Sequence, residues 1–296
     1  MEHLDAVPGP TSAGPTSAGP TSAGPTPTEL RRLAVEIATA AGELICAGRP
    51  DRVEVAATKS GPTDVVTAMD TASEQLLRQR LRSARPQDGV LGEEEGWTAG
   101  SSGLTWVLDP IDGTVNYLYG LRSYAVSVAV VAHDPAAAPD PATWTVLAAA
   151  VVDPSAAETW SAQAGGGATL TDARGTRPLH VAPGPALGQA LVATGFGYDA
   201  ARRAEQAAVL TRLLPRVRDL RRIGTASLDL CAVAAGRVDA YYELGLNPWD
   251  FAGGWLVARE AGAVVTDFAG GPAGSHGLLA AGPGLHPVLR DGLGLG

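Results

Sequence analysis

Hydrophobic residues along this chain follow two different spacings, which separate predicted helices from predicted strands. Apolar periodicity and capping residues predict helices over residues 28–47, 67–84, 200–214, 225–235 and 248–261. Short apolar runs bounded by turn residues predict strands at 88–92, 104–109, 123–132, 145–153, 157–162, 190–194, 218–222, 238–243 and 263–267. A strand-rich first half followed by alternating strands and helices predicts the α/β class, built as a sandwich of sheets and helices.

The first residues differ from the rest of the chain because they repeat one short sequence. Over residues 9–26 the string Gly-Pro-Thr-Ser-Ala occurs three times and a fourth copy then begins. Such a tract has no apolar face to bury, so residues 1–26 are expected to be a disordered tail, either a tolerated extension or a docking segment. Thr26 and Glu29 fit a capping box around a proline, which predicts a single folded unit over residues 27–296.

Composition limits the classes of partner. The 296 residues are 45% hydrophobic but only 5% aromatic, which predicts a large core built mainly of Ala, Val and Leu. A formal charge of −9, with no basic stripe, argues against a nucleic-acid partner.

No apolar run approaches a membrane span and the N-terminus has no leader pattern, so a cytoplasmic location is expected. Cys46 and Cys231 are expected to be small core residues rather than a disulfide or metal pair.

Two carboxylates and a stiff turn follow the apolar run that begins at Trp106. Asp109 is expected at the end of this strand, the edge at which open α/β sheets bind ligands. Asp112 follows at a spacing that lets both carboxylates converge on one hard cation, and Gly113 permits a tight turn with exposed backbone N–H groups. Asp-Gly is also a common turn dipeptide, so this string by itself is more typical of a plain connection between strands.

Two further acidic segments fall at the ends of predicted elements. The run Glu93-Glu94-Glu95 follows a short apolar stretch, and its like charges repel unless water or a cation neutralises them; a solvated loop is the alternative. Asp250 lies in the first turn of the helix predicted over 248–261. The helix dipole favours a carboxylate there even without a metal, so Asp250 alone would be interpreted as a helix-start residue.

Together these segments resemble the signatures of the inositol monophosphatase family. The first signature is Gly92-Glu-Glu followed by Trp106-Val-Leu-Asp-Pro-Ile-Asp-Gly-Thr-Val-Asn-Tyr117, and the second is Trp249-Asp-Phe-Ala-Gly-Gly-Trp-Leu-Val-Ala-Arg-Glu-Ala-Gly262. Arg222-Ile-Gly-Thr-Ala226 and Asp239-Ala-Tyr-Tyr-Glu-Leu-Gly245 are similar to the substrate-side segments of the family. The resemblance implies the layered α/β/α/β/α arrangement of the inositol monophosphatase and fructose-1,6-bisphosphatase type.

The resemblance also implies a magnesium centre of two or three ions. Glu93, Asp109 and the backbone carbonyl of Ile111 correspond to ligands of a first Mg²⁺. Asp109, Asp112 and Asp250 correspond to ligands of a second, so Asp109 would bridge the two ions. Magnesium suits these residue types independently, because it is a hard ion that prefers carboxylates, water and phosphate oxygens.

The same resemblance assigns roles in the reaction. Glu93 and Thr114 would orient and deprotonate the attacking water, with Asp112 in the same catalytic set. The N–H groups of Gly113 and Thr114 would hold phosphate oxygens, and Asp250 would position the water that protonates the departing alkoxide. No covalent phosphoenzyme is expected.

The organic half of the substrate is assigned in the same way. The implied substrate contacts are Asp112, Gly113, Thr114, Gly224, Thr225, Ala226, Glu243 and Asp250. Glu243 follows a predicted apolar strand, where a carboxylate could accept hydrogen bonds from ring hydroxyls; a strand-end charge facing water is an equally good interpretation of the residue by itself.

Lys59 is the only lysine in the chain. One explanation for this single lysine is a need for a compact ammonium group, which the planar guanidinium of arginine does not replace. Chance retention in an arginine-rich chain explains it equally well. The resemblance implies that Lys59 is a peripheral residue of the active site.

The function implied is Mg²⁺-dependent hydrolysis of a small phosphomonoester, with myo-inositol monophosphate as the first choice of substrate. Histidinol phosphate, fructose 1,6-bisphosphate and phosphoadenosine phosphate are the alternatives within the enzyme class. A catalytically silent regulator that binds a metal or a phospholigand is the non-enzyme alternative. Members of the family commonly form homodimers, and the residues themselves leave the oligomeric state open.

Overall fold

A computed structural model describes residues 24–50, 53–59, 61 and 65–295. Within these residues the larger sheet has eight strands in the order β10-β9-β8-β7-β6-β5-β3-β4. Their bounds are β3 Gly89–Gly92, β4 Gly96–Thr98, β5 Leu104–Asp112, β6 Ala125–Ala132, β7 Thr145–Asp153, β8 Glu158–Gln163, β9 Gly167–Asp172 and β10 Gly175–Pro178. Strands β3 and β5 pair in parallel, whereas the other neighbours in this sheet run antiparallel.

The smaller sheet has five strands among the described residues, in the order β12-β11-β13-β15-β14. Their bounds are β11 Leu191–Thr194, β12 Asp219–Arg221, β13 Ala240–Glu243, β14 Val264–Thr266 and β15 Leu278–Ala281. Strand β11 runs parallel to both of its neighbours, and β15 runs antiparallel to both of its own. The longer helices are α1 Pro27–Ala47, α2 Ala68–Ala84, α4 Ala200–Leu213, α5 Ala226–Ala234, α6 Pro248–Glu260 and α7 His286–Leu293.

Alternate residues of the strands face different cores, which fixes the order of the layers. In the larger sheet, Trp106 and Leu108 pack in the core beneath α1 and α2, whereas Val107 packs on the opposite face with residues of α5 and α6. In the smaller sheet, Tyr241 faces the core shared with α5 and α6, and its neighbour Tyr242 faces the core shared with α4 and α7.

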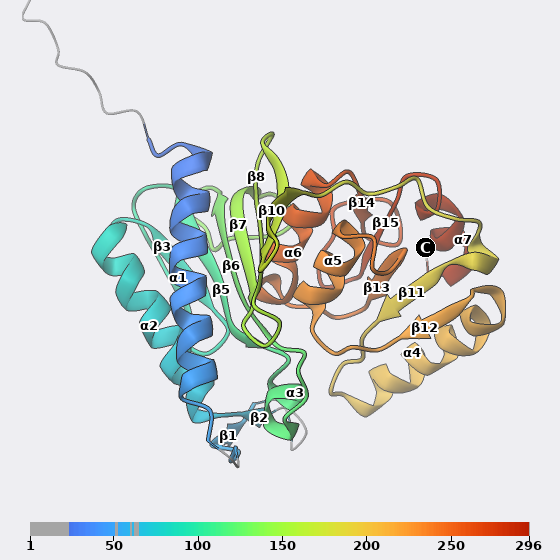
Figure 1. The fold of residues 1–296 in the computed structure, drawn as a ribbon, viewed down its shortest axis with the longest axis horizontal. Coiled ribbons are helices and arrows are strands. Elements are labelled where there is room, and N and C mark those ends of the chain that lie inside the picture. Colours follow the sequence, from blue (N-terminus) through green and yellow to red (C-terminus); the bar gives the residue numbers. More distant parts are fainter. Residues whose placement is uncertain (1–23, 51–52, 60, 62–64, 296) are drawn as a thin grey trace, which may run out of the picture.

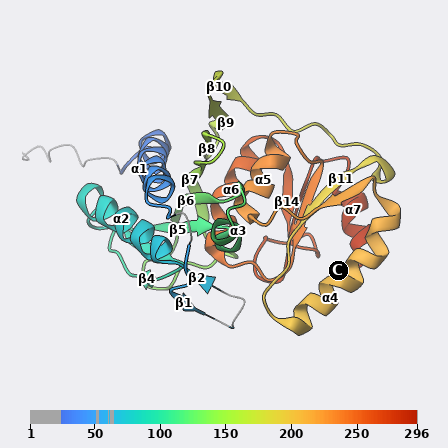
Figure 2. The ribbon, with the colours of Figure 1, turned by 60° about the horizontal axis from the view of Figure 1, so that its bottom comes forward.

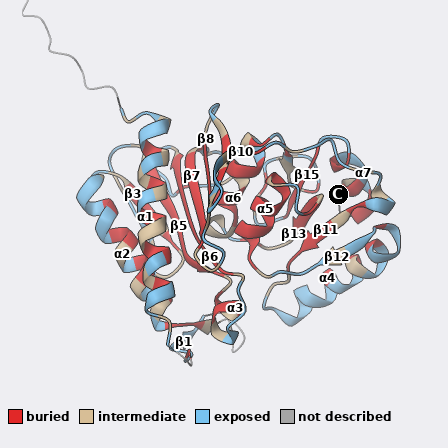
Figure 3. Cartoon of the chain, viewed as in Figure 1, coloured by how far each residue is buried: buried red, intermediate tan, exposed pale blue. Residues whose placement is uncertain are grey.

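The layers are therefore α1 and α2, the larger sheet, α5 and α6, the smaller sheet, and α4 and α7 (Figure 1). Buried residues follow the inner surfaces of these layers, whereas the outer faces of α1, α2 and α4 are exposed (Figure 3). The α/β/α/β/α arrangement expected from the resemblance is confirmed.

The predicted helices and strands occur close to their expected bounds. The capping box at the start of α1 is confirmed, because the Thr26 N–H donates to Glu29 Oε2 at 2.8 Å and the Glu29 N–H donates to Thr26 Oγ1 at 3.3 Å. Elements that the prediction lacked are β4, β9, β10, β15, α7, the short helix α3 Thr114–Tyr119, the pair β1 Ala57–Thr58 and β2 Val65–Val66, and the 3₁₀ turns η1 Leu187–Gln189 and η2 Leu214–Arg216.

Three other expectations meet different outcomes. Residues 1–23, which hold most of the repeat, lie outside the described residues, so the disorder of the tail stays a prediction. Cys231 is buried and free as expected, but Cys46 is exposed near the end of α1, so its placement in the core was wrong. In the described part of the chain, no helix is both long enough and apolar enough to cross a membrane.

Candidate active site

A bulge in β5 brings the acidic residues of the first signature to one point. Asp109 pairs with Ser127 and Asp112 pairs with Ala125, so three steps along β5 match only two along β6. The extra residue breaks the regular ladder, which makes room for Pro110, a residue with no N–H to donate. Asp109 was expected at the end of the strand, and this was wrong, because the bulge carries the strand on through Asp112.

Gly113 is required both for its backbone conformation and for space. Its φ of +91° lies in the left-handed region that glycine adopts without strain. A Cβ atom at this position would lie 2.5 Å from Thr225 Cγ2 and 3.0 Å from the Ser123 carbonyl oxygen. The chain therefore turns sharply from β5 into α3, which lies beside β2 (Figure 2).

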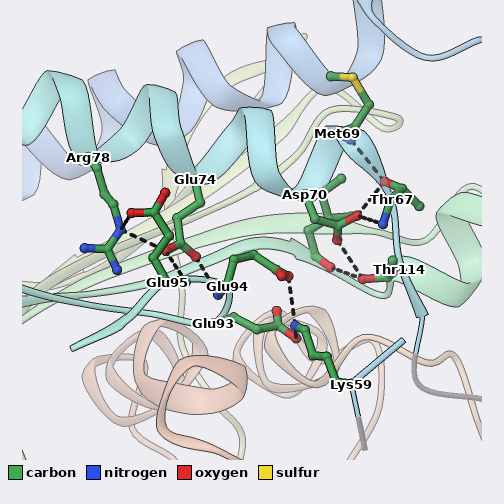
Figure 4. Close-up of polar contacts among 11 residues, drawn as sticks. Lys59, Thr67, Met69, Asp70, Glu74, Arg78, Glu93, Glu94, Glu95 and Thr114 are labelled. Carbon is green, nitrogen blue, oxygen red and sulfur yellow. Dashed lines mark hydrogen bonds and ion pairs between the residues drawn. The ribbon is translucent and has the colours of Figure 1, made fainter. Parts of the chain in front are cut away.

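Thr114 begins α3 and shares its hydroxyl with a buried carboxylate. Thr114 Oγ1 lies 3.0 Å from Asp70 Oδ1 and 3.0 Å from the Ile111 carbonyl oxygen (Figure 4). Asp70 is fully buried at the start of α2, where its other oxygen accepts the Thr67 N–H at 2.8 Å. Asp70 was not among the residues predicted for the site, although the Thr67-x-x-Asp70 capping pattern preceding a helix was a usable signal.

Glu93 approaches the same point from the end of β3. Its backbone N–H donates to the Leu108 carbonyl oxygen at 3.2 Å, which ties this turn to β5. Lys59 Nζ lies 2.8 Å from Glu93 Oε1 and 2.8 Å from Glu94 Oε1 (Figure 4). Lys59 is therefore in direct contact with the acidic group.

Asp250 is supplied by the second half of the chain. It lies in the first turn of α6 and accepts the Asn247 N–H at Oδ2, at a distance of 2.6 Å. The helix-start role that its sequence position suggested is therefore present. Burial, with the nearby charges of Glu93 and Asp112, raises the pKa of Asp250 well above its ordinary value, so Asp250 also belongs to the acidic cluster and the two interpretations of this residue are compatible.

Burial and mutual repulsion dominate the electrostatics of this cluster. Burial, with the nearby charges of Glu93, Asp112 and Asp250, raises the pKa of Asp109 well above its ordinary value. Burial also raises the pKa of Glu93 to about 7 and that of Asp112 to about 6. These carboxylates resist ionising together unless a positive charge joins them.

The residues fit a divalent metal ion by their chemistry. Asp109 Oδ1 is buried and has no hydrogen-bond partner among the described residues, as expected of an atom whose partner is a cation. The donors are all oxygens, which suits a hard ion such as Mg²⁺. Within the described ranges, however, no three His, Cys, Asp or Glu side chains already stand where they could hold an ion together.

One cavity of about 440 Å³ joins the acidic cluster to the segments expected to hold the organic half of a substrate. The predicted site residues that line it are Lys59, Glu93, Asp109, Ile111, Asp112, Gly113, Thr114, Gly224, Ala226, Glu243 and Asp250. Thr225 does not line it, because its hydroxyl lies 3.0 Å from Ser123 Oγ and its methyl group packs under Gly113.

Glu243, the last residue of β13, also lines this cavity. The Tyr241 hydroxyl donates to Glu243 Oε2 at 2.6 Å, and burial raises the pKa of Glu243 to about 7. A partly buried carboxylate that is already oriented by one donor can accept further hydrogen bonds from hydroxyl groups in the cavity. The interpretation as a charge facing open water does not fit this position.

The layered α/β/α/β/α fold thus carries a cavity that joins an acidic cluster to Glu243. The chain belongs to the inositol monophosphatase family, whose model matches residues 26–292. It is an enzyme of the phosphoric monoester hydrolase class, in a family that is generally Mg²⁺-dependent.

Individual relatives agree with this assignment. An inositol-1-monophosphatase of Mycobacterium leprae is 46% identical over 286 residues, which cover 90% of this chain and 94% of the relative. The solved structure of Mycobacterium tuberculosis SuhB is 43% identical, with a TM-score of 0.75 over 91% of this chain and 97% of that one. A Vibrio cholerae relative, named Nus factor SuhB, is 38% identical over 81% of this chain and 85% of its own length.

Proposed function

We propose that this enzyme hydrolyses small phosphomonoesters with Mg²⁺, and that myo-inositol monophosphate is its preferred substrate. The observation that carries the proposal is a single cavity whose lining includes Asp109, Asp112, Glu93 and Asp250 together with Glu243. The acidic cluster suits a metal and a phosphate, and Glu243 suits a ring that bears hydroxyl groups.

The metal ligands proposed are Glu93, Asp109, the carbonyl of Ile111, Asp112 and Asp250, for two or three ions. Mg²⁺, when bound there, supplies the positive charge that attracts a phosphate into an acidic cavity and makes a water a stronger acid. The orphaned Oδ1 of Asp109 supports this ligand set, because a buried carboxylate oxygen without a donor is costly unless a cation serves it.

Side chains of this protein are proposed to carry out the proton transfers. Glu93 accepts the proton of the attacking water, and the Thr114 hydroxyl, which donates to Asp70 Oδ1 at 3.0 Å, accepts a hydrogen bond from that water and orients it. The N–H groups of Gly113 and Thr114 bind phosphate oxygens. Asp250 positions the water that returns a proton to the departing alkoxide.

The organic group of the substrate is proposed to rest against the part of the cavity that Glu243 and Gly224 line. Glu243 accepts hydrogen bonds from ring hydroxyls, and the Gly224–Ala226 segment brings its backbone close to the ring. Gly224 supports a close approach, because its φ of +101° suits glycine and a Cβ there would lie 2.3 Å from Arg222 Nη1.

A panel of phosphomonoesters tests the substrate. Phosphate release is measured with Mg²⁺ for inositol 1-phosphate, histidinol phosphate, fructose 1,6-bisphosphate and phosphoadenosine phosphate. The proposal predicts the highest kcat/KM for inositol 1-phosphate. A higher value for any other compound would overturn the substrate and leave the class of reaction in place.

The non-enzyme alternative makes a different prediction. A silent regulator on the same fold would bind Mg²⁺ or a phospholigand without releasing phosphate from any compound of the panel. Calorimetric binding measured on the same preparation separates such a protein from one that is simply misfolded.

Three further properties belong to the proposal. The catalytic unit spans residues 27–296, the protein acts in the cytoplasm, and it forms a homodimer. Deletion of residues 1–25 is expected to leave kcat/KM unchanged, and light scattering of the purified chain is expected to give twice the mass of 30.1 kDa.

A further inference from the structure

A second buried carboxylate, Glu74, stands behind the acidic turn and has no place in the chemistry above. It lies on α2, one helical turn after Asp70, and its side chain is 0% exposed. Its Oε2 accepts the Glu94 N–H at 2.8 Å and its Oε1 accepts the Glu95 N–H at 3.0 Å (Figure 4). Both carboxylate oxygens therefore bind the backbone of the turn that carries Glu93.

Arg78 completes this contact one turn further along α2. Its Nε donates to Glu74 Oε1 at 2.8 Å, and its Nη2 donates to the Gly96 carbonyl oxygen at 2.6 Å. Its Nη1 lies 3.3 Å from Thr98 Oγ1. Glu74 thus binds N–H groups of the β3–β4 turn, and Arg78 binds a carbonyl oxygen of the same turn.

Gly92 is explained by the same carboxylate. A Cβ atom on Gly92 would lie 2.2 Å from Glu74 Oε1, closer than any side chain permits. Gly92 is not among the residues with positive φ, so its backbone conformation does not demand glycine. The glycine before the paired glutamates is therefore required by the space that Glu74 occupies.

Energetics favour a positional role for this pair over a stabilising one. A buried ion pair gains little stability relative to apolar residues of the same volume, because both charges lose their hydration. The turn it binds also carries the like charges Glu93, Glu94 and Glu95, which favour a spread conformation. The hydrogen bonds from the Glu94 and Glu95 N–H groups to Glu74 fix the backbone of this turn in one conformation.

We propose that Glu74, oriented by Arg78, is a positioning residue that holds the Glu93–Glu95 backbone so that the Glu93 side chain faces Asp109. The inference rests on the proposed function, since Glu93 is there a metal ligand and a base. Glu74 acts only through the turn and touches neither substrate nor metal.

Glu74→Gln is the direct test, with Glu43→Gln, an exposed residue of α1, as the matched control. The amide has one acceptor oxygen where the carboxylate has two, so at least one N–H of the turn loses its partner. Hydrogen exchange of the Glu94 and Glu95 amides is expected to quicken at least about tenfold. The Kd for Mg²⁺, measured by calorimetry without substrate, is expected to rise about 10- to 100-fold.

The pattern of effects separates positioning from general destabilisation. Glu74→Gln is expected to move the half-saturating Mg²⁺ concentration more than the kcat at saturating Mg²⁺, while exchange in α5 and β13 stays as in the natural chain. Gly92→Ala, which displaces the carboxylate without removing it, is expected to give the same pattern and replaces Glu74→Gln if that variant does not fold.

Outcomes for the two proposals are distinguishable. Unchanged amide exchange and unchanged Mg²⁺ affinity in both folded variants would overturn the positioning role. A natural chain that binds Mg²⁺ but releases no phosphate, with exchange and affinity altered in the variants as described, would sustain the positioning role and remove the proposed phosphatase function.

Discussion

Ser227 donates both its backbone N–H and its hydroxyl to a single oxygen of Asp112. The N–H lies 2.7 Å and the hydroxyl 2.5 Å from Asp112 Oδ2, across 115 positions of the sequence. Burial raises the pKa of Asp112 and these bonds lower it, and the net result is a pKa of about 6. The start of α5 therefore both orients Asp112 and helps to keep it ionised.

Ser227→Ala is expected to shift the acidic limb of the pH–rate profile upward. A metal ligand must be ionised, so protons compete with Mg²⁺ for Asp112, and activity at sub-saturating Mg²⁺ falls as pH drops. Loss of a hydrogen bond to the charged form raises that pKa, by about one unit if the bond contributes about 1.4 kcal/mol. The profile of kcat/KM against pH measures the shift, with the exposed Ser83→Ala as control. An acidic limb at the same pH in Ser227→Ala and in the natural chain would contradict this role of Ser227.

Thr114→Val is expected to lower kcat by about 10²- to 10⁴-fold, because it replaces the hydroxyl by a methyl group of similar size. Thr114→Ser keeps the hydroxyl within reach of Asp70 and is expected to retain most of the activity. Single-turnover phosphate release measures the step directly. Equal rates for the Ser and Val variants would show that the hydroxyl takes no part.

Lys59→Gln is expected to tighten Mg²⁺ binding severalfold. The ammonium lies 2.8 Å from Glu93 Oε1, so it competes with a metal for this carboxylate and repels a cation nearby. Lys59→Arg keeps the charge and serves as the control. Calorimetric titration measures both variants; weaker binding in Lys59→Gln would indicate that Lys59 assists the metal instead.

Asp229→Asn is expected to stabilise the protein at neutral pH. Asp229 Oδ1 is buried with no partner among the described residues, and burial, together with Glu243, raises its pKa well above the usual value. A raised folded-state pKa means that the free energy of unfolding falls as pH rises from about 4, the unfolded value, towards the folded one. The variant removes this loss, so the difference in Tm between Asp229→Asn and the natural chain should grow with pH. Asp291→Asn, on an exposed side chain, should show no such difference.

The spacing of hydrophobic residues predicted most helices and strands, because burial within an element depends on local sequence, whereas the order of the layers came from the family resemblance. The apolar runs of β5 and β6 and the capping box of α1 do not depend on distant residues. The bulge between Asp109 and Asp112 depends on the register with β6, which no local pattern contains. Short elements such as α3, with six residues, carry too little periodicity to be recognised.

The candidate site was predictable to the extent that its residues form continuous strings. Glu93, Asp112 and Glu243 stand in motifs, and the structure places all three in the lining of one cavity. Ser227 and Glu74 were missed because each acts on a partner that folding alone brings near. Ser227 lies 115 positions from Asp112, and Glu74 lies 20 positions from Glu94.

Phosphate release from inositol 1-phosphate, followed across a Mg²⁺ titration for the natural chain and for Asp112→Asn, tests the central claim most directly. The natural chain should turn over with a rate that rises with Mg²⁺ and vanishes with a chelator. Asp112→Asn should be slower by about 10²-fold or more at every Mg²⁺ concentration, since the neutral amide is a poor ligand for a hard cation. Equal rates for the two proteins, or a rate unaffected by the chelator, would contradict the metal-dependent mechanism.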